Sequence, residues 1–221
     1  MQRGLGSLTT PKYVLDRAEV TAIVGSRPDE ALRIARDIDE PWYRCQALAC
    51  VAHHCVDREE KNRLVGEAFQ AALGAPNPNR IVSVSSWPLK VVCKSQQAGL
   101  LRAEIGRLLG IIAQEPSPVR RANALNTMLG AVVSGPIELF WHVFEAFEKA
   151  CFEPLLNGKR NVRGESQLVL WVPAVDRFDP ARAGALLEAV KGPVLRKRGV
   201  EWLERFRQTD LEALYTWPNL R

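Results

Sequence analysis

The chain has 221 residues, of which 47% are apolar and 25% are charged, a balance that excludes intrinsic disorder of the whole chain. Thirty Lys and Arg against 25 Asp and Glu give a formal net charge of +5, with both signs interspersed along the sequence. This modest excess supports solubility and is only a slight indication of an anionic partner.

The first eleven residues lack the apolar core of a secretory signal, and no apolar run approaches the roughly 18 residues that span a bilayer. We therefore predict a cytoplasmic protein that does not associate with a membrane. The cysteines are odd in number and follow no framework spacing, which favours buried, reduced thiols over disulfides. They are Cys45, Cys50, Cys55, Cys93 and Cys151.

A unit of two helices joined by a turn is predicted to begin near residue 28. The pattern Ser26-Arg27-Pro28-Asp29 places a capping residue ahead of a proline in a first helical turn. Ile34, Ala35 and Ile38 then recur every three or four residues and line one face of a helix. Pro41 ends that helix or starts the next one.

The second helix of this unit opens with a pattern that recurs along the chain. Pro41 is followed by Arg44, and then by the small and large apolar residues Ala47 and Leu48. The same offsets recur after two further prolines. They give Arg121, Ala124 and Leu125 after Pro118, and Arg196, Gly199 and Val200 after Pro193. Three copies of one helix start are thus predicted.

Two weaker copies lie between these three. Arg80 follows an Asn-Pro turn, and Arg163 follows the Asn157-Gly158 turn. The repeated arginines are then roughly 33 to 42 residues apart, an irregular period near that of helical-pair repeats. Strand signals are scarce, and the short apolar runs at 91–92 and 168–172 fall where the repeat expects buried second helices. We expect Pro88 and Pro173 to kink or end those helices.

The recurring Pro-x-x-Arg-x-x-small-large pattern between amphipathic helices resembles the HEAT and TPR class of helical repeats, although the aromatic signature positions of a TPR consensus are absent. The resemblance implies an all-α fold, a right-handed stack of antiparallel helix pairs forming an α-α superhelix of about five irregular repeats. It covers residues 28–205 of a single domain, with caps at 1–27 and 206–221. Such a stack leaves a concave face for peptides, proteins or nucleic acid.

The repeated arginines have two interpretations. Arg44, Arg80, Arg121, Arg163 and Arg196 each fall at the start of a second helix, where free backbone amides already favour an anion. Three of these positions are enlarged into basic clusters, which include Arg120 beside Arg121, and a stripe of such clusters would bind an acidic protein segment or a nucleic-acid backbone. Alternatively, each arginine stabilises its own unit by binding carboxylates or carbonyls of the preceding turn.

Aromatic and metal-binding residues supply the remaining candidates. Trp87, Trp171 and Trp202 fall in or beside second helices and are predicted to be core, whereas Trp42, next to a turn proline, is predicted to be the exposed anchor. Trp141 and Trp217 are the other two tryptophans. The densest set of potential zinc ligands is Cys50 with His53 and His54, but no second ligand pair accompanies it, so a core cluster is favoured.

Three functions compete. The leading hypothesis is a non-catalytic scaffold that binds a segment of a partner protein on the concave face and needs no cofactor. The first alternative is a nucleic-acid-binding protein that uses the clustered arginines, and the second is a helical repeat protein with a structural zinc. Three histidines and no phosphate-binding loop leave little material for common catalytic mechanisms.

Overall fold

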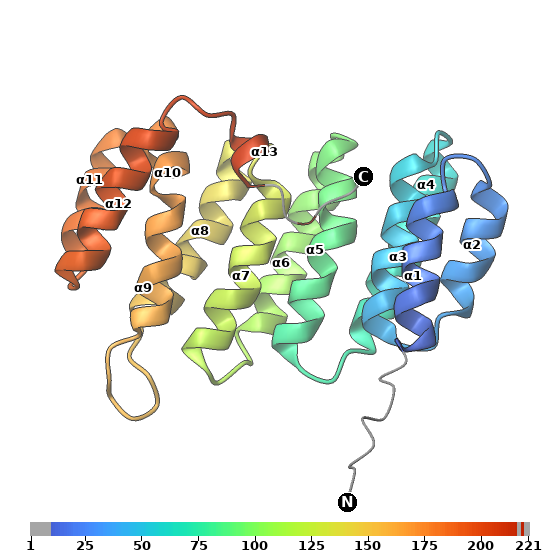
Figure 1. Cartoon of the computed structure of the whole chain (residues 1–221), viewed down its shortest axis with the longest axis horizontal. Coiled ribbons are helices and arrows are strands. Elements are labelled where there is room, and N and C mark those ends of the chain that lie inside the picture. The colour runs from blue at the N-terminus through green and yellow to red at the C-terminus, as the bar shows by residue number, and fades with distance from the viewer. Residues whose placement is uncertain (1–9, 216–217, 219–221) are drawn as a thin grey trace, which may run out of the picture.

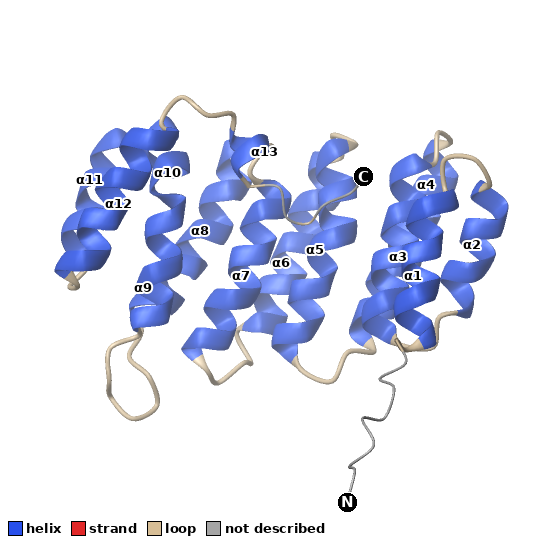
Figure 2. Ribbon diagram, viewed as in Figure 1, coloured by secondary structure: helices blue, strands red, loops and turns tan. Residues whose placement is uncertain are grey.

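The computed structural model describes residues 10–215 and Pro218, and all secondary structure within them is helical. Figures 1 and 2 show the helices as one elongated row. The α-helices in chain order are α1 Lys12–Ile23, α2 Pro28–Asp37, α3 Pro41–His54, α4 Arg58–Leu73, α5 Pro78–Lys94, α6 Ala98–Ile112, α7 Pro118–Val132, α8 Ile137–Phe152, α9 Val162–Leu168, α10 Val172–Phe178, α11 Pro180–Ala189, α12 Pro193–Phe206 and α13 Leu211–Leu214. A short 3₁₀ helix, η1, joins α9 to α10 over Val169–Trp171.

The row has two layers over most of its length. In the first layer α1 packs on α3, α3 on α5, α5 on α7, and α7 on α9. In the second layer α2, α4, α6 and α8 pack on their chain neighbours in the first. Towards the C-terminal end, α10 packs against both α11 and α12, which interrupts the simple alternation. Helices close in sequence are therefore neighbours in space.

Proline begins several helices where the sequence predicts it, Pro28 of α2 among them, but the cap predicted at Ser26 is wrong, because the N-cap residue of α2 is Arg27 and no side chain caps this helix. Proline occupies the first turn of α3, α5, α7 and α12, where its missing amide hydrogen costs nothing. The Asn77 side chain accepts a hydrogen bond from the Arg80 amide at the start of α5. Ser117 does the same for the Arg120 amide at α7. These caps satisfy amides that have no partner inside the helix.

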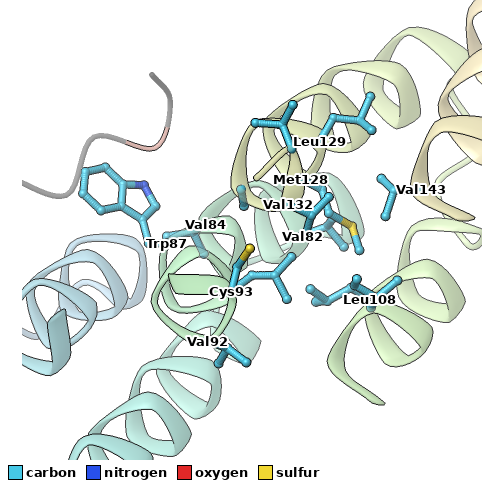
Figure 3. Close-up of a cluster of buried hydrophobic side chains, with 14 of the residues drawn as sticks. Val82, Val84, Trp87, Val92, Cys93, Leu108, Met128, Leu129, Val132 and Val143 are labelled. Atoms are coloured by element: carbon cyan, nitrogen blue, oxygen red, sulfur yellow. The ribbon is translucent and has the colours of Figure 1, made fainter. Parts of the chain in front are cut away.

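The core lies along the first layer, because these helices have neighbours on nearly every side. All residues from 45 to 52 in α3, and all from 84 to 93 in α5, are buried. Figure 3 shows side chains of α5 meeting those of α6, α7 and α8, among them Val82, Leu108, Met128 and Val143. Buried apolar surface of this extent stabilises the row by about 25 cal/mol per Å² removed from water.

The predicted small and large apolar positions are both buried in the copies at Pro41 and Pro118, whereas in the copy at Pro193 only the small one, Gly199, is buried. Ala47, Leu48, Ala124 and Leu125 are all at most 2% exposed. Val200, at the equivalent position of the last copy, is 40% exposed. Figure 1 shows α12 at the end of the row, where the described part of the chain adds no further helix to the stack.

The two predicted proline interruptions differ. Helix α5 continues through Pro88 to Lys94, so of the two predicted outcomes, a kink or an end, this proline does not end the helix. Pro173 falls in the first turn of α10, directly after η1, so the regular α-helix is interrupted beside this proline, as predicted. No helix in the described part of the chain is long and apolar enough to cross a membrane.

Candidate partner-binding groove

The repeated arginines all lie at one edge of the row. Arg44, Arg80, Arg121, Arg163 and Arg196 are in the first turns of α3, α5, α7, α9 and α12. Figure 1 shows these helices entering from the same, lower edge. The predicted arginines therefore do form a row along one edge. Whether the row binds a partner or stabilises the fold depends on what each side chain contacts.

Three of these arginines bind the backbone of their own unit. The Arg44 Nε donates to the Ile38 carbonyl at 2.5 Å, and Arg121 Nη1 donates to the Glu115 carbonyl at 2.5 Å. Arg196 Nη2 donates to the Val190 carbonyl at 2.9 Å. In each case the acceptor lies six residues earlier, where the preceding helix has ended. These guanidinium groups hold two helices together, as the alternative interpretation of the arginines expected.

The other three basic candidates, Arg80, Arg120 and Arg163, differ from one another in their surroundings. Arg120 pairs with the buried carboxylate of Glu115 at 3.2 Å. The Arg80 guanidinium lies 5.4 Å from the centre of the Trp42 ring, a cation–π contact. Trp42 is therefore half-buried and not the exposed anchor that its turn position suggested. Arg163 is exposed.

The potential zinc ligands do not converge. Cys50 is buried in α3, and burial raises the pKa of its thiol, which disfavours the thiolate that binds metal. The Nδ1 atom of His54 lies 3.0 Å from the Cys50 carbonyl oxygen and donates to it, which leaves only Nε2 of this ring free. His53 lines a separate pocket. Among the residues described, no three His, Cys, Asp or Glu side chains form a metal-binding group.

A different feature of the molecule resembles a binding site more closely. A groove of about 260 Å³ lies between α7, η1 and α12, and α13 closes one side of it. Its lining is mainly apolar and aromatic, with one amide side chain at its base. The lining residues are Asn126, Gly130, Leu170, Trp171, Trp202, Leu214 and Tyr215.

Hydrogen bonds fix the two tryptophans of the groove. The Trp171 indole N–H donates to Asn126 Oδ1 at 2.7 Å, and the Trp202 indole N–H donates to the Leu170 carbonyl at 3.1 Å. Trp171 is 2% exposed and Trp202 is half-buried. Because their polar atoms are satisfied within the protein, both rings present rigid apolar surface to whatever lies in the groove.

The chain's own C-terminal segment forms one wall of this groove. The Tyr215 ring is parallel to the Trp171 ring, and its hydroxyl donates to the Leu170 carbonyl at 2.7 Å. Burial raises the pKa of the Tyr215 hydroxyl, so it remains a neutral donor.

No family model, curated protein or solved structure matches the chain. The groove must therefore be interpreted from its own chemistry.

Contacts outside the groove hold the C-terminal segment in position. Glu212 of α13 pairs with Lys94 at the end of α5, with Nζ and Oε1 2.8 Å apart. Arg177 donates to the Arg207 and Thr209 carbonyls and holds the turn before α13. Leu211 is buried as part of the hydrophobic core. Figure 1 shows α13 lying across this layer beside α7.

Sequence reasoning missed most of this groove. Trp171 and Trp202 were singled out, but as core residues, and neither Asn126 nor Tyr215 carried a signal. The contacts join residues about 30 to 45 positions apart, which no local pattern reveals. Trp217, another aromatic residue named from the sequence, lies outside the described residues.

Proposed function

We propose that this chain is a non-catalytic protein-interaction scaffold, a right-handed α-α superhelix of about five irregular helix pairs that works in the cytoplasm. The recurring helix start at Pro41, Pro118 and Pro193, and the two layers of neighbouring helices, support this architecture. The partner segment would bind on the face of the first layer that carries α13, which we take to be the concave face.

The docking of the chain's own C-terminal segment is the observation that carries the proposal. A short helix with two leucines and one carboxylate, followed directly by an aromatic residue, already packs beside α5, α7 and η1. The groove therefore has the elements of helix-in-groove recognition, with aromatic anchoring at one end and a charge pair at the other.

The segment also indicates what a partner would carry. Glu212 lies in α13, and Tyr215 follows the end of this helix, three residues after Glu212. Glu212 pairs with Lys94 while Tyr215 stacks on Trp171. We infer that the partner presents a short helical segment with an acidic residue followed three positions later by an aromatic one.

The two alternative functions receive less support. Arg44, Arg121 and Arg196 donate to internal carbonyls, so much of the hydrogen-bonding capacity that a phosphate backbone would need is already used. The zinc hypothesis lacks a converging set of ligands among the described residues. We therefore retain the peptide groove as the single proposed site.

A peptide with the chain's own sequence over 208–218 tests the proposal. We would label it with fluorescein and titrate it with full-length chain carrying Tyr215→Ala, in which the internal segment no longer holds the groove. We expect saturable binding, and at least about tenfold weaker binding to the wild-type chain, because the tethered segment competes at a millimolar effective concentration.

The matched control is the same peptide with alanine in place of Tyr215. If the control peptide bound the variant chain as tightly as the parent peptide, the aromatic anchor would have no role and the proposed groove would be wrong. Equal binding of the parent peptide to wild-type and variant chains would show that it binds elsewhere.

A further inference from the structure

A second pocket, of about 520 Å³, lies at the edge of the row opposite the repeated arginines. It forms where α3 ends, α4 begins and α5 turns into α6. Three helices and one loop contribute cations or polar groups to its walls, and a volume of this size lies within the range of small-molecule sites. His53, Arg58, Lys61 and Lys94 are its basic lining residues.

The charge around this pocket is strongly positive. Arg58 is exposed and Lys61 half-exposed, and neither forms an ion pair within the described part of the chain. Lys94 pairs with Glu212, the one carboxylate that an ion pair brings to this rim. That pair shows that the rim already accepts an anionic oxygen.

The surroundings of His53 have the same positive charge. Burial lowers the pKa of its imidazole, and the neighbouring charges of His54, Lys94, Lys61 and Lys90 lower that pKa further. A neutral imidazole on the wall can donate or accept one hydrogen bond without adding to the repulsion among the cations.

The rest of the lining is polar. Ser95, Gln96 and Gln97 continue the wall from α5 into α6. Gln97 is the N-cap residue of α6, but its side chain makes no capping hydrogen bond and instead donates to Asn62 Oδ1 at 2.8 Å. The start of α6 thus adds its partial positive charge to that of the side chains. Among the described residues no Phe, Tyr or Trp lines the pocket, so they offer no platform for stacking a nucleobase.

We propose that this pocket binds a phosphorylated polar small molecule, with its phosphate between Arg58, Lys61 and Lys94 and its hydroxyl groups on the glutamine wall. Arginine and lysine bind phosphate oxygens through charge-assisted hydrogen bonds, which two closely spaced cations and one further lysine supply here. The proposal does not rest on the partner groove, but the two sites share Lys94, so a bound phosphate would compete with Glu212 for its ammonium group.

Isothermal titration with pyrophosphate tests the assignment on the full chain. We expect saturable binding to the wild-type protein, and about a tenfold or greater loss of affinity in the double variant Arg58→Gln/Lys61→Gln, because two charge-assisted contacts are removed. The matched control is Lys191→Gln/Arg198→Gln, which removes the same charge from two exposed positions near the other end of the row. It should change the affinity less than twofold.

Three results would overturn the proposal. The first is no saturable binding of pyrophosphate to the wild-type chain, and the second is an equal loss in both double variants, which would indicate unspecific attraction to a basic protein. The third is equally tight binding of succinate, which would make the site one for carboxylates. A wild-type NMR titration gives a readout that needs no variant, since pyrophosphate should shift the His53 imidazole resonances and leave those of His142 unchanged.

Discussion

The rings of Trp171 and Tyr215 are stacked with their centroids 3.9 Å apart and their planes inclined by only 4°. Trp171 comes from η1, in the middle of a layered row, whereas Tyr215 comes from the C-terminal segment that crosses that row. The pair therefore links a rigid site to a segment that is held by few contacts. Removing either ring should reveal how strongly the segment is bound.

Tyr215→Ala should release the C-terminal segment and expose the Trp171 ring. We expect the free energy of unfolding to fall by about 1 to 3 kcal/mol, because a stacked pair and a buried hydrogen bond are lost. Urea unfolding measures that loss, and iodide quenching of tryptophan fluorescence should increase. Tyr215→Phe keeps the stack and should lose only about 1 kcal/mol. Equal losses in both variants would mean that the ring contributes nothing.

Arg121→Ala should lower stability, because Arg121 connects two helical units. Its guanidinium donates to the Glu115 carbonyl and pairs with Glu153 at 2.5 Å, while only 16% of the side chain is exposed. We expect a loss of about 2 kcal/mol in urea unfolding. Arg163→Ala is the matched control, since Arg163 occupies an equivalent helix start but is exposed, and should change stability by less than about 0.5 kcal/mol. The opposite ranking would show that the contacts of Arg121 with Glu115 and Glu153 do not stabilise the fold.

The helix starts were predictable from the sequence, because each depends on neighbouring residues. Pro41 and Pro118 sit in first helical turns, and the alanine and leucine that follow each of them are buried. The amphipathic spacing that predicts these positions arises from the helix itself and needs no knowledge of distant contacts. This is why the all-α character of the described chain was correctly predicted.

The contacts of the candidate site were not predictable, because they join distant parts of the chain. Nothing near Asn126 in the sequence indicates that its side chain accepts from Trp171, 45 positions later. Likewise, Arg44 had two open interpretations, and the choice depended on where the Ile38 carbonyl points after its helix ends. Long-range geometry of this kind is set by how helices pack, and many sequences with the same local pattern would pack differently.

Stability should rise with pH through the range near pH 6.5 because of His53. Its folded pKa lies below the ordinary histidine value, first because of burial and then because of neighbouring cations. The unfolded chain therefore binds more protons than the folded chain as the pH falls, and the free energy of unfolding decreases in that direction. Urea unfolding between pH 5 and pH 8 measures the slope, and His53→Gln should flatten it. An unchanged slope in that variant would assign the pH dependence to other groups.

Two glycine-to-alanine substitutions should have opposite effects, because the two glycines have different surroundings. A Cβ atom at Gly164 would lie 2.7 Å from both the Cα and the carbonyl oxygen of Cys151, and backbone atoms cannot move aside cheaply. Gly164→Ala should therefore cost about 1 to 3 kcal/mol through strain between α8 and α9. Gly106 lies on the exposed face of α6 with nothing within 4 Å of the added atom. Gly106→Ala should stabilise the protein by about 0.5 to 1 kcal/mol, because alanine loses less backbone entropy in a helix. Thermal melting of the two variants beside the wild type tests both signs, and a tolerated alanine at Gly164 would show that the contact between α8 and α9 is looser than the distances indicate.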